Sequence, residues 1–276
     1  MENALQRFRL DDRVAIVTGG AGLLGIKHAE AIAEAGGISV LWDIDGDAAQ
    51  TEAANIQSTH SIPSVGMKVD ITNSDSIQSG LDHTLSSLKR VDILINNAAN
   101  NPKVDKTGEA NWSRFENFNL DVWNQDIAVG LTGAFRCSQI IGSHLAKQNR
   151  GVILNIASDL SVISPDQRLY REEGIPEDKQ SVKPVTYSVI KHALIGLTKY
   201  LATYWAINNV RVNAISPGGV YAGQPDHFVK KLINLIPAGR MANVDEYKAA
   251  ILFLCSDASS YMTGQNIVID GGRTIL

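Results

Sequence analysis

The sequence predicts a doubly wound α/β fold, a parallel sheet of about seven strands with helices on both faces. Short β-branched apolar runs alternate with helix-length amphipathic patterns along the whole chain. These runs are too apolar for a sheet that has one face in water. Because no repeat, low-complexity tract or linker interrupts the 276 residues, we expect one domain spanning residues 1–276. A closed eight-fold barrel is the alternative, disfavoured by the strand number and the long loops.

The apolar runs and the amphipathic patterns place the elements in order. Buried strands are predicted at Val14–Val17, Ile38–Trp42, Val91–Ile95, Val152–Ile156, Val210–Ile215 and Ile267–Ile269, with a weaker one at Ser64–Val69. Helices are predicted at Leu24–Ala35, Asp45–Ser58, Ser74–Leu88, Asp121–Lys147, Tyr187–Ile207 and Asp245–Cys255. Two long polar stretches, 100–119 and 163–184, each follow a strand. Loops in that position form the ligand crevice of a parallel sheet, so we expect substrate loops there, with tolerated surface insertions as the alternative.

The composition excludes several classes of function. The 25 basic and 29 acidic residues are interspersed and sum to a net charge of −4, which favours neither nucleic acid nor an anionic membrane as partner. No apolar run reaches the length of a membrane span or signal peptide, so a cytoplasmic protein is expected. The 2 cysteines and 6 histidines show no metal-ligand spacing, and no metal is expected.

A glycine-rich loop, Thr18–Gly25, follows the first predicted strand and precedes a helix. Glycines 19, 22 and 25 permit a tight turn, close approach of the backbone to a pyrophosphate, and close packing of the helix on the strand. The helix N-terminus adds N–H donors for the phosphates. Ile26 stands where a mononucleotide P-loop needs lysine, so the loop indicates a dinucleotide-binding Rossmann fold.

Asp43 ends the second predicted strand. A carboxylate there accepts hydrogen bonds from the adenine ribose hydroxyls and repels a 2′-phosphate. The following residues, 44–47, contain no lysine or arginine, so NAD rather than NADP is the predicted cofactor. A helix cap is the alternative for Asp43, and Asp45 is better placed for that task.

Tyr187 and Lys191 lie four positions apart, and therefore on one face of a predicted helix. A phenol titrates near pH ~10, and we expect the adjacent ammonium to lower the pKa of Tyr187 so that it serves as acid or base. Lys191 also reaches a cofactor ribose. Ser158 follows a buried strand, where its hydroxyl can bond the reacting oxygen. A surface Tyr/Lys pair is the alternative, but the dinucleotide loop favours a catalytic set of Ser158, Tyr187 and Lys191.

These residues resemble the short-chain dehydrogenase/reductase family over nearly the whole chain. The resemblance rests on TGGAGLLG (18–25), Asp43, Asp70, NNAA (96–99), Ser158, YSVIK (187–191), RVNAISPGGV (211–220) and YMTGQNIVIDGG (261–272). Family members usually form dimers or tetramers through their two long helices, so the resemblance implies a homodimer or homotetramer.

The resemblance also implies a set of cofactor contacts. The set comprises Gly19, Gly22, Leu23, Leu24 and Gly25 in the loop, Asp43 and Ile44 at the ribose, Asp70 and Ile71 at the adenine, Asn97, Ala98 and Ala99 along the groove, Tyr187 and Lys191, and Pro217, Gly218 and Val220 at the nicotinamide.

Several features depart from the usual family pattern, among them Ala222 where a threonine is usual. Leu23 stands where the classical branch has glycine, so the loop has the spacing of the extended branch. Gly130 stands where an asparagine usually anchors a water of the proton relay, which leaves only a backbone carbonyl for that task. Ser158 and Tyr187 are 29 positions apart, more than the family's usual spacing, so residues between them form an insertion.

The polar residues of the two loops suit a hydroxylated or anionic substrate, which favours a sugar or an activated sugar acid. Candidate substrate residues are Asn100, Asp159, Arg168 and Tyr170. The resemblance is closest to bacterial members of surface-sugar and flagellin-glycan pathways, which implies a role in carbohydrate biosynthesis.

The predicted reaction is hydride transfer between NAD and a secondary alcohol or ketone. A sugar epimerase or dehydratase, which oxidises its substrate transiently and releases no NADH, is the alternative enzyme. A non-catalytic NAD-binding regulatory protein is the alternative outside enzymes.

Overall fold

A computed structural model describes residues 3–100 and 112–276. Seven strands form one parallel sheet in the order β3-β2-β1-β4-β5-β6-β7. The strands are β1 (Val14–Thr18), β2 (Ile38–Asp43), β3 (Ser64–Lys68), β4 (Ile93–Asn96), β5 (Gly151–Ile156), β6 (Val210–Pro217) and β7 (Asn266–Ile269). The doubly wound parallel sheet predicted from the apolar runs is thus confirmed, including its weakest strand.

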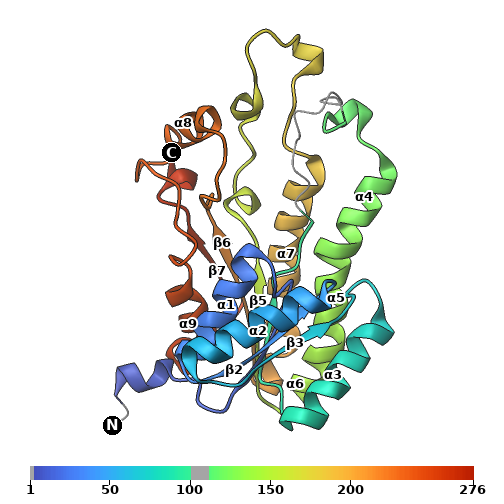
Figure 1. Cartoon of the computed structure of the whole chain (residues 1–276), viewed down its shortest axis with the longest axis vertical. Helices are drawn as coiled ribbons and strands as arrows, with labels where there is room; N and C mark the ends of the chain where they lie inside the picture. Colours follow the sequence, from blue (N-terminus) through green and yellow to red (C-terminus); the bar gives the residue numbers. More distant parts are fainter. Residues whose placement is uncertain (1–2, 101–111) are drawn as a thin grey trace.

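Helices cover both faces of the sheet (Figure 1). They are α1 (Leu23–Glu34), α2 (Gly46–His60), α3 (Ser74–Leu88), α4 (Leu120–Ile127), α5 (Ala134–Cys137), α6 (Ser143–Lys147), α7 (Val185–Tyr204), α8 (Asp226–Ile233) and α9 (Lys248–Cys255). One core lies under α1, α2 and α9 and contains Ile32, Ile56 and Ile251. The other lies under α3, α5, α6 and α7 and contains Ile77 and Leu145.

The long helix predicted at 121–147 is one helical stretch with two irregular segments. It runs through α4, α5 and α6, which are joined by π-helical segments at Ala128–Gly133 and Ser138–Gly142. Helix α7 begins at Val185, directly after Pro184, whose ring holds an extended conformation that precedes the helix. It ends at Tyr204, short of the predicted Ile207, and a 3-10 turn at Ala206–Asn208 continues the chain.

Helix α8 has no counterpart among the predicted elements. Its eight residues, DHFVKKLI, hold too short a pattern to be recognised in sequence alone. Its apolar residues Phe228 and Leu232 pack in a small cluster with Leu169 and Tyr170, which belong to the stretch 163–184. A partner that is distant in sequence therefore stabilises this helix.

The stretch 163–184, called the insertion below, projects from one end of the sheet together with α8 and the start of α4 (Figure 1). The Gln180 side chain holds it in shape by donating to the carbonyls of Glu172 and Ile175 and by accepting from the N–H of Glu172. Of the other predicted loop, 100–119, residues 101–111 lie outside the described residues. Within the described ranges, no helix has the length and apolarity needed to cross a membrane.

Candidate functional site

The strand order reverses between β1 and β4, and the loops after these two strands are tied together. The Thr18 hydroxyl accepts hydrogen bonds from the N–H groups of Asn97 and Ala98, at 3.0 and 3.1 Å. The Asn97 amide donates to the carbonyls of Thr18 and Gly19, each at 3.0 Å. Open parallel sheets bind ligands at such a reversal, so these bonds fix the glycine loop at the expected place.

The glycine loop packs tightly on one side and is open on the other. A Cβ on Gly25 would lie 2.1 Å from the Gly19 carbonyl oxygen, which no side chain tolerates. Gly22, at the start of α1, is exposed and provides no side-chain cap for the first N–H groups of that helix. Helix α2, in contrast, is capped by Asp45, which accepts from the N–H of Ala48. The uncapped N-terminus of α1 therefore fits an anionic group such as a pyrophosphate.

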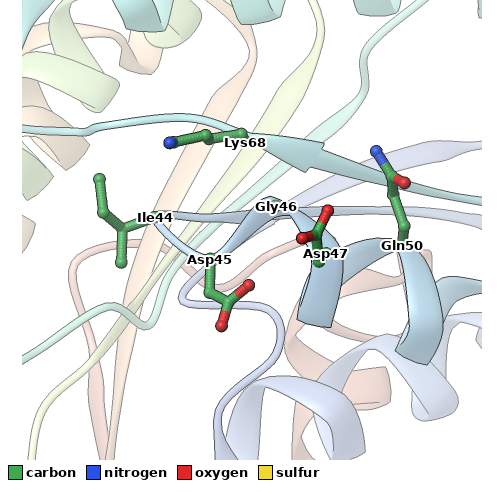
Figure 2. Close-up of a pocket in the computed structure, with 6 residues that line it drawn as sticks. All are labelled: Ile44, Asp45, Gly46, Asp47, Gln50 and Lys68. Atoms are coloured by element: carbon green, nitrogen blue, oxygen red, sulfur yellow. The ribbon is translucent and has the colours of Figure 1, made fainter.

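Asp43 is oriented by this loop. Its carboxylate accepts hydrogen bonds from the N–H groups of Ala21 and Asp45, each at 3.1 Å. The sequence after Asp43 holds no cation, but the neighbouring strand brings one, because Lys68 is paired with Asp43 in the sheet register. A pocket of about 420 Å³ lies beside these strand ends and is lined by Ile44, Asp45, Gly46, Asp47, Gln50 and Lys68. Figure 2 shows Lys68 across this pocket from Ile44 and the acidic residues.

The other predicted cofactor residues follow neighbouring strands. The Asp70 carboxylate accepts from both the N–H and the hydroxyl of Thr72, at 2.8 and 2.6 Å. The Ile71 side chain is buried in the core, which leaves its backbone for contact with a ligand. After β6, the Gly218 carbonyl accepts from the Tyr247 hydroxyl at 3.1 Å, and Val220 forms a parallel bridge with Ala242.

Ser158, Tyr187 and Lys191 converge where β5 ends. The Ser158 hydroxyl donates to the Asp159 carboxylate at 2.8 Å, and a hydrogen bond joins Ser158 to Tyr187. The Lys191 ammonium donates to the Ile156 carbonyl at 2.7 Å and lies 5.7 Å from the centre of the Tyr187 ring. The structure therefore brings Ser158 and Tyr187 together although the insertion separates them in sequence.

Burial and two neighbouring groups act on the pKa of Tyr187 in opposite directions. Burial raises the pKa of Tyr187, the hydrogen bond with Ser158 lowers it, and the Asp159 charge raises it again; the net direction is upward. The expectation that Lys191 lowers this pKa is wrong, because the net direction is upward and Lys191, whose ammonium donates to the Ile156 carbonyl, is not among the groups that shift it. Burial and the nearby Lys183 lower the pKa of Lys191 itself, to about 8.

The candidate substrate residues divide into two groups. Asp159 is buried beside Ser158, and the charges of Asp159 and Arg273 affect the pKa of Tyr170, which burial raises to about 12. Asn100 ends the described part of the loop after β4. Arg168 is not brought to the site: its side chain is 76% exposed and paired with Asp166.

Two residues near the catalytic set are not among the candidate site residues chosen from the sequence. The Lys183 ammonium lies 3.9 Å from the centre of the Tyr187 ring. Arg273, close to the C-terminus, donates to Asp159 at 2.6 Å. Lys183 stands in the insertion, four positions before Tyr187. This spacing from the YSVIK motif is a sequence signal that could have identified Lys183 as a neighbour of the tyrosine. Nothing in the sequence pattern connects Arg273 to Ser158.

Packing explains why glycine stands at position 130. A Cβ at this position would lie 2.9 Å from a side-chain carbon of Ile190, the neighbour of Lys191. Ile190 thus fills the space that an asparagine at position 130 would need. A water relay at this position is therefore limited to backbone groups.

Comparisons with known proteins agree with this geometry. A profile of the short chain dehydrogenase family matches residues 13–170, and a profile described as Enoyl-(Acyl carrier protein) reductase matches residues 177–274. An NAD-dependent glycerol dehydrogenase of Listeria innocua is 35% identical over 97% of this chain and 96% of its own. A D-threitol dehydrogenase of Mycolicibacterium smegmatis is 33% identical over 97% and 95%. The crystal structure of a gluconate 5-dehydrogenase from Burkholderia cenocepacia in complex with NADP and tartrate superposes with a TM-score of 0.86, at 28% identity, over 99% of this chain and 100% of that one.

Proposed function

Because the chain belongs to the short-chain dehydrogenase family and is an oxidoreductase acting on CH–OH groups, we propose that it is an NAD-dependent dehydrogenase of free polyols. It converts a secondary hydroxyl into a ketone and catalyses the reverse reduction. The observation that supports this most is the meeting of Ser158, Tyr187 and Lys191 at the strand ends that carry the glycine loop.

Each member of the catalytic set has one task. When bound, NAD would supply the acceptor for the hydride that leaves the carbinol carbon as its C–H bond breaks. Tyr187 takes the hydroxyl proton of the alcohol, so that the products are a ketone, NADH and one proton. Ser158 hydrogen-bonds the reacting oxygen and orients it toward Tyr187. Lys191, fixed by the Ile156 carbonyl, would hold the ribose of the bound cofactor.

The cofactor contacts are those that the resemblance implies. Gly19, Gly22, Leu23, Leu24 and Gly25 hold the pyrophosphate, Asp43 and Ile44 the ribose, Asp70 and Ile71 the adenine, and Asn97, Ala98, Ala99, Pro217, Gly218 and Val220 the nicotinamide half. NAD is proposed over NADP because three carboxylates, Asp43, Asp45 and Asp47, surround the place of a 2′-phosphate, against the one ammonium of Lys68. A lower dissociation constant for NADP than for NAD would contradict this choice.

The substrate proposed is a free polyol rather than an activated sugar. The relatives named above are a glycerol, a threitol and a gluconate dehydrogenase. In this proposal, polar side chains of the insertion and of the loop after β4, with Tyr170, Asp159 and Asn100 among them, form the substrate contacts.

The test is NADH formation, followed by absorbance, with a panel of polyols, nucleotide-linked sugars and apolar secondary alcohols. The proposal predicts net NADH with polyols. Conversion of a sugar without net NADH favours the epimerase, and turnover confined to apolar alcohols contradicts the polyol assignment.

We also propose a homodimer or homotetramer that buries α5 and α7. Exposed aromatic side chains on these helices, Phe135, Tyr200 and Tyr204, favour burial against a second copy. Light scattering that gives the mass of one chain at micromolar concentration contradicts this assembly.

A further inference from the structure

A buried ion pair lies directly behind the catalytic serine. One oxygen of the Asp159 carboxylate accepts two hydrogen bonds, from the Ser158 hydroxyl oxygen and from the Leu160 backbone nitrogen, each at 2.8 Å. The other oxygen accepts from the Arg273 guanidinium at 2.6 Å. The two charged side chains are 4% and 8% exposed, so they interact in a nearly dry environment.

The last turn of the chain is built to deliver Arg273 to this place. Asp270, which directly follows β7, accepts from the N–H groups of Gly272 and Thr274 at 2.9 and 2.7 Å. Gly271 and Gly272 both have positive φ, at 66° and 91°, a conformation that favours glycine. The chain thereby turns back over the end of the sheet, and a residue 114 positions from Asp159 reaches the Ser158 side of the site.

Stability alone is a weak reason for such a pair. Removing two charges from water costs free energy that their attraction hardly exceeds, and apolar side chains of similar volume often serve as well or better. The pair does have a defined effect on Ser158, because the hydroxyl donates to the Asp159 carboxylate. While the Arg273 guanidinium holds that carboxylate in place, this hydrogen bond fixes the position of the Ser158 oxygen.

We propose that Arg273 is a positioning residue of the reaction, which acts through Asp159 to fix the Ser158 hydroxyl against Tyr187 and the reacting oxygen. Its charge also offsets that of Asp159, which would otherwise act on the phenol at full strength. This proposal rests on the proposed dehydrogenase function for its kinetic consequences, but the geometry concerns Tyr187 whether or not a polyol is bound.

The charged and titratable groups facing Tyr187 come from four segments. Asp159 follows β5, Lys191 lies on α7 itself, Tyr170 and Lys183 belong to the insertion, and Arg273 lies in the final turn. Of these, Arg273 is the group whose removal leaves the Asp159 charge without its ionic partner.

The experiment compares Arg273→Gln, Arg273→Lys, Asp159→Asn and the double variant Asp159→Asn/Arg273→Gln with wild type. Steady-state oxidation of a turned-over polyol is measured from pH 6 to pH 10 (about four units, along the limb where the phenol is still mostly protonated). Arg240→Gln is the matched control, because Arg240 forms a similar ion pair with Glu246 on the surface. A second readout is the tyrosinate absorbance titration of each variant against the same variant carrying Tyr187→Phe.

Arg273→Gln is expected to lower kcat about 10- to 100-fold, since small displacements of reacting groups have effects of that size, with the dissociation constant of NAD unchanged. The titration of Tyr187 and the acidic limb of the pH profile shift upward by about 0.5–1 pH unit in Arg273→Gln and downward in Asp159→Asn. Arg273→Lys restores part of kcat, and the double variant is no worse than the poorer single variant because both act on the same hydroxyl.

An Arg273→Gln variant with wild-type kcat and an unshifted Tyr187 titration overturns the proposal. The proposal is also overturned if Arg273→Gln and the double variant both lose activity together with an equal loss of NAD binding or of folding. If wild type turns over no polyol, the proposed function fails, and the tyrosinate titration, which needs no substrate, still decides the role of Arg273.

Discussion

The cofactor end and the substrate end of the molecule are assembled in different ways. At the cofactor end, most of the proposed contacts come from short segments directly after β1, β2, β3, β4 or β6, and hydrogen bonds such as Asn97 to Gly19 hold the loops after β1 and β4 together. At the substrate end, Ser158, Tyr170, Tyr187 and Arg273 come from four segments, two of them inserted or terminal. A local motif defines the first end, whereas long-range packing defines the second.

Tyr187→Phe is the most damaging change expected at the substrate end. The ring still packs, but no group remains to exchange the proton, so kcat falls by about 10³- to 10⁴-fold. NAD affinity, measured by fluorescence titration, stays within about twofold because the phenyl ring of the variant fills the same space. Tyr261→Phe is the control, since Tyr261 is fully exposed. Wild-type turnover by Tyr187→Phe would refute the assignment of the tyrosine.

Gly25→Ala is the change expected to disturb the cofactor end most. The new Cβ would lie 2.1 Å from the Gly19 carbonyl oxygen, so the loop must shift away from its phosphate-binding shape. We expect the dissociation constant of NAD to rise about 100-fold, in line with a loss of roughly 3 kcal/mol, and the melting temperature to fall. Gly196→Ala on α7 is the matched control, because a Cβ there meets nothing within 4 Å. Unchanged NAD binding in Gly25→Ala would contradict the proposed role of the loop.

Asp43→Ser removes the carboxylate that is held by Ala21 and Asp45. Loss of a charged hydrogen-bond acceptor is expected to raise the dissociation constant of NAD about 10- to 30-fold. The dissociation constant of NADP should fall at the same time, because Lys68 then faces the 2′-phosphate with one carboxylate fewer. Calorimetric titration with both cofactors checks this, and a parallel rise in both constants would show that Asp43 has no part in the choice.

The pH dependence of the two reaction directions sharpens the account of the substrate end. The pKa of Tyr187 is raised by burial and by Asp159, so the phenol is protonated at neutral pH. Oxidation needs the phenolate as base, and its rate should rise about tenfold per pH unit below that pKa. Reduction needs the phenol as acid and should be constant over this range and decline above it. Initial rates in both directions across pH test this; oxidation that is fastest at acidic pH would contradict it.

The sequence predicts the fold, and the place of the glycine loop between β1 and α1, because both depend on local patterns. Alternating apolar runs define the strands, and glycines with fixed spacing define the loop. Helix α8 was missed because Leu169 of the insertion stabilises it, and Arg273 was missed because only the finished sheet brings it to Asp159. The upward pKa of Tyr187 was missed for a similar reason, since it follows from burial and from the charge of Asp159. Side-chain direction is not visible in the spacing of Tyr and Lys alone.

Deuterium transfer tests the central proposal most directly. The protein is incubated with glycerol deuterated at carbon 2, or with threitol deuterated at its secondary carbons, in the presence of equal NAD and NADP. Mass spectrometry of the reduced dinucleotides then follows the label. The proposed hydride transfer predicts singly deuterated NADH together with the matching ketone. Reduced dinucleotide without deuterium, or label found only in NADPH, would contradict it.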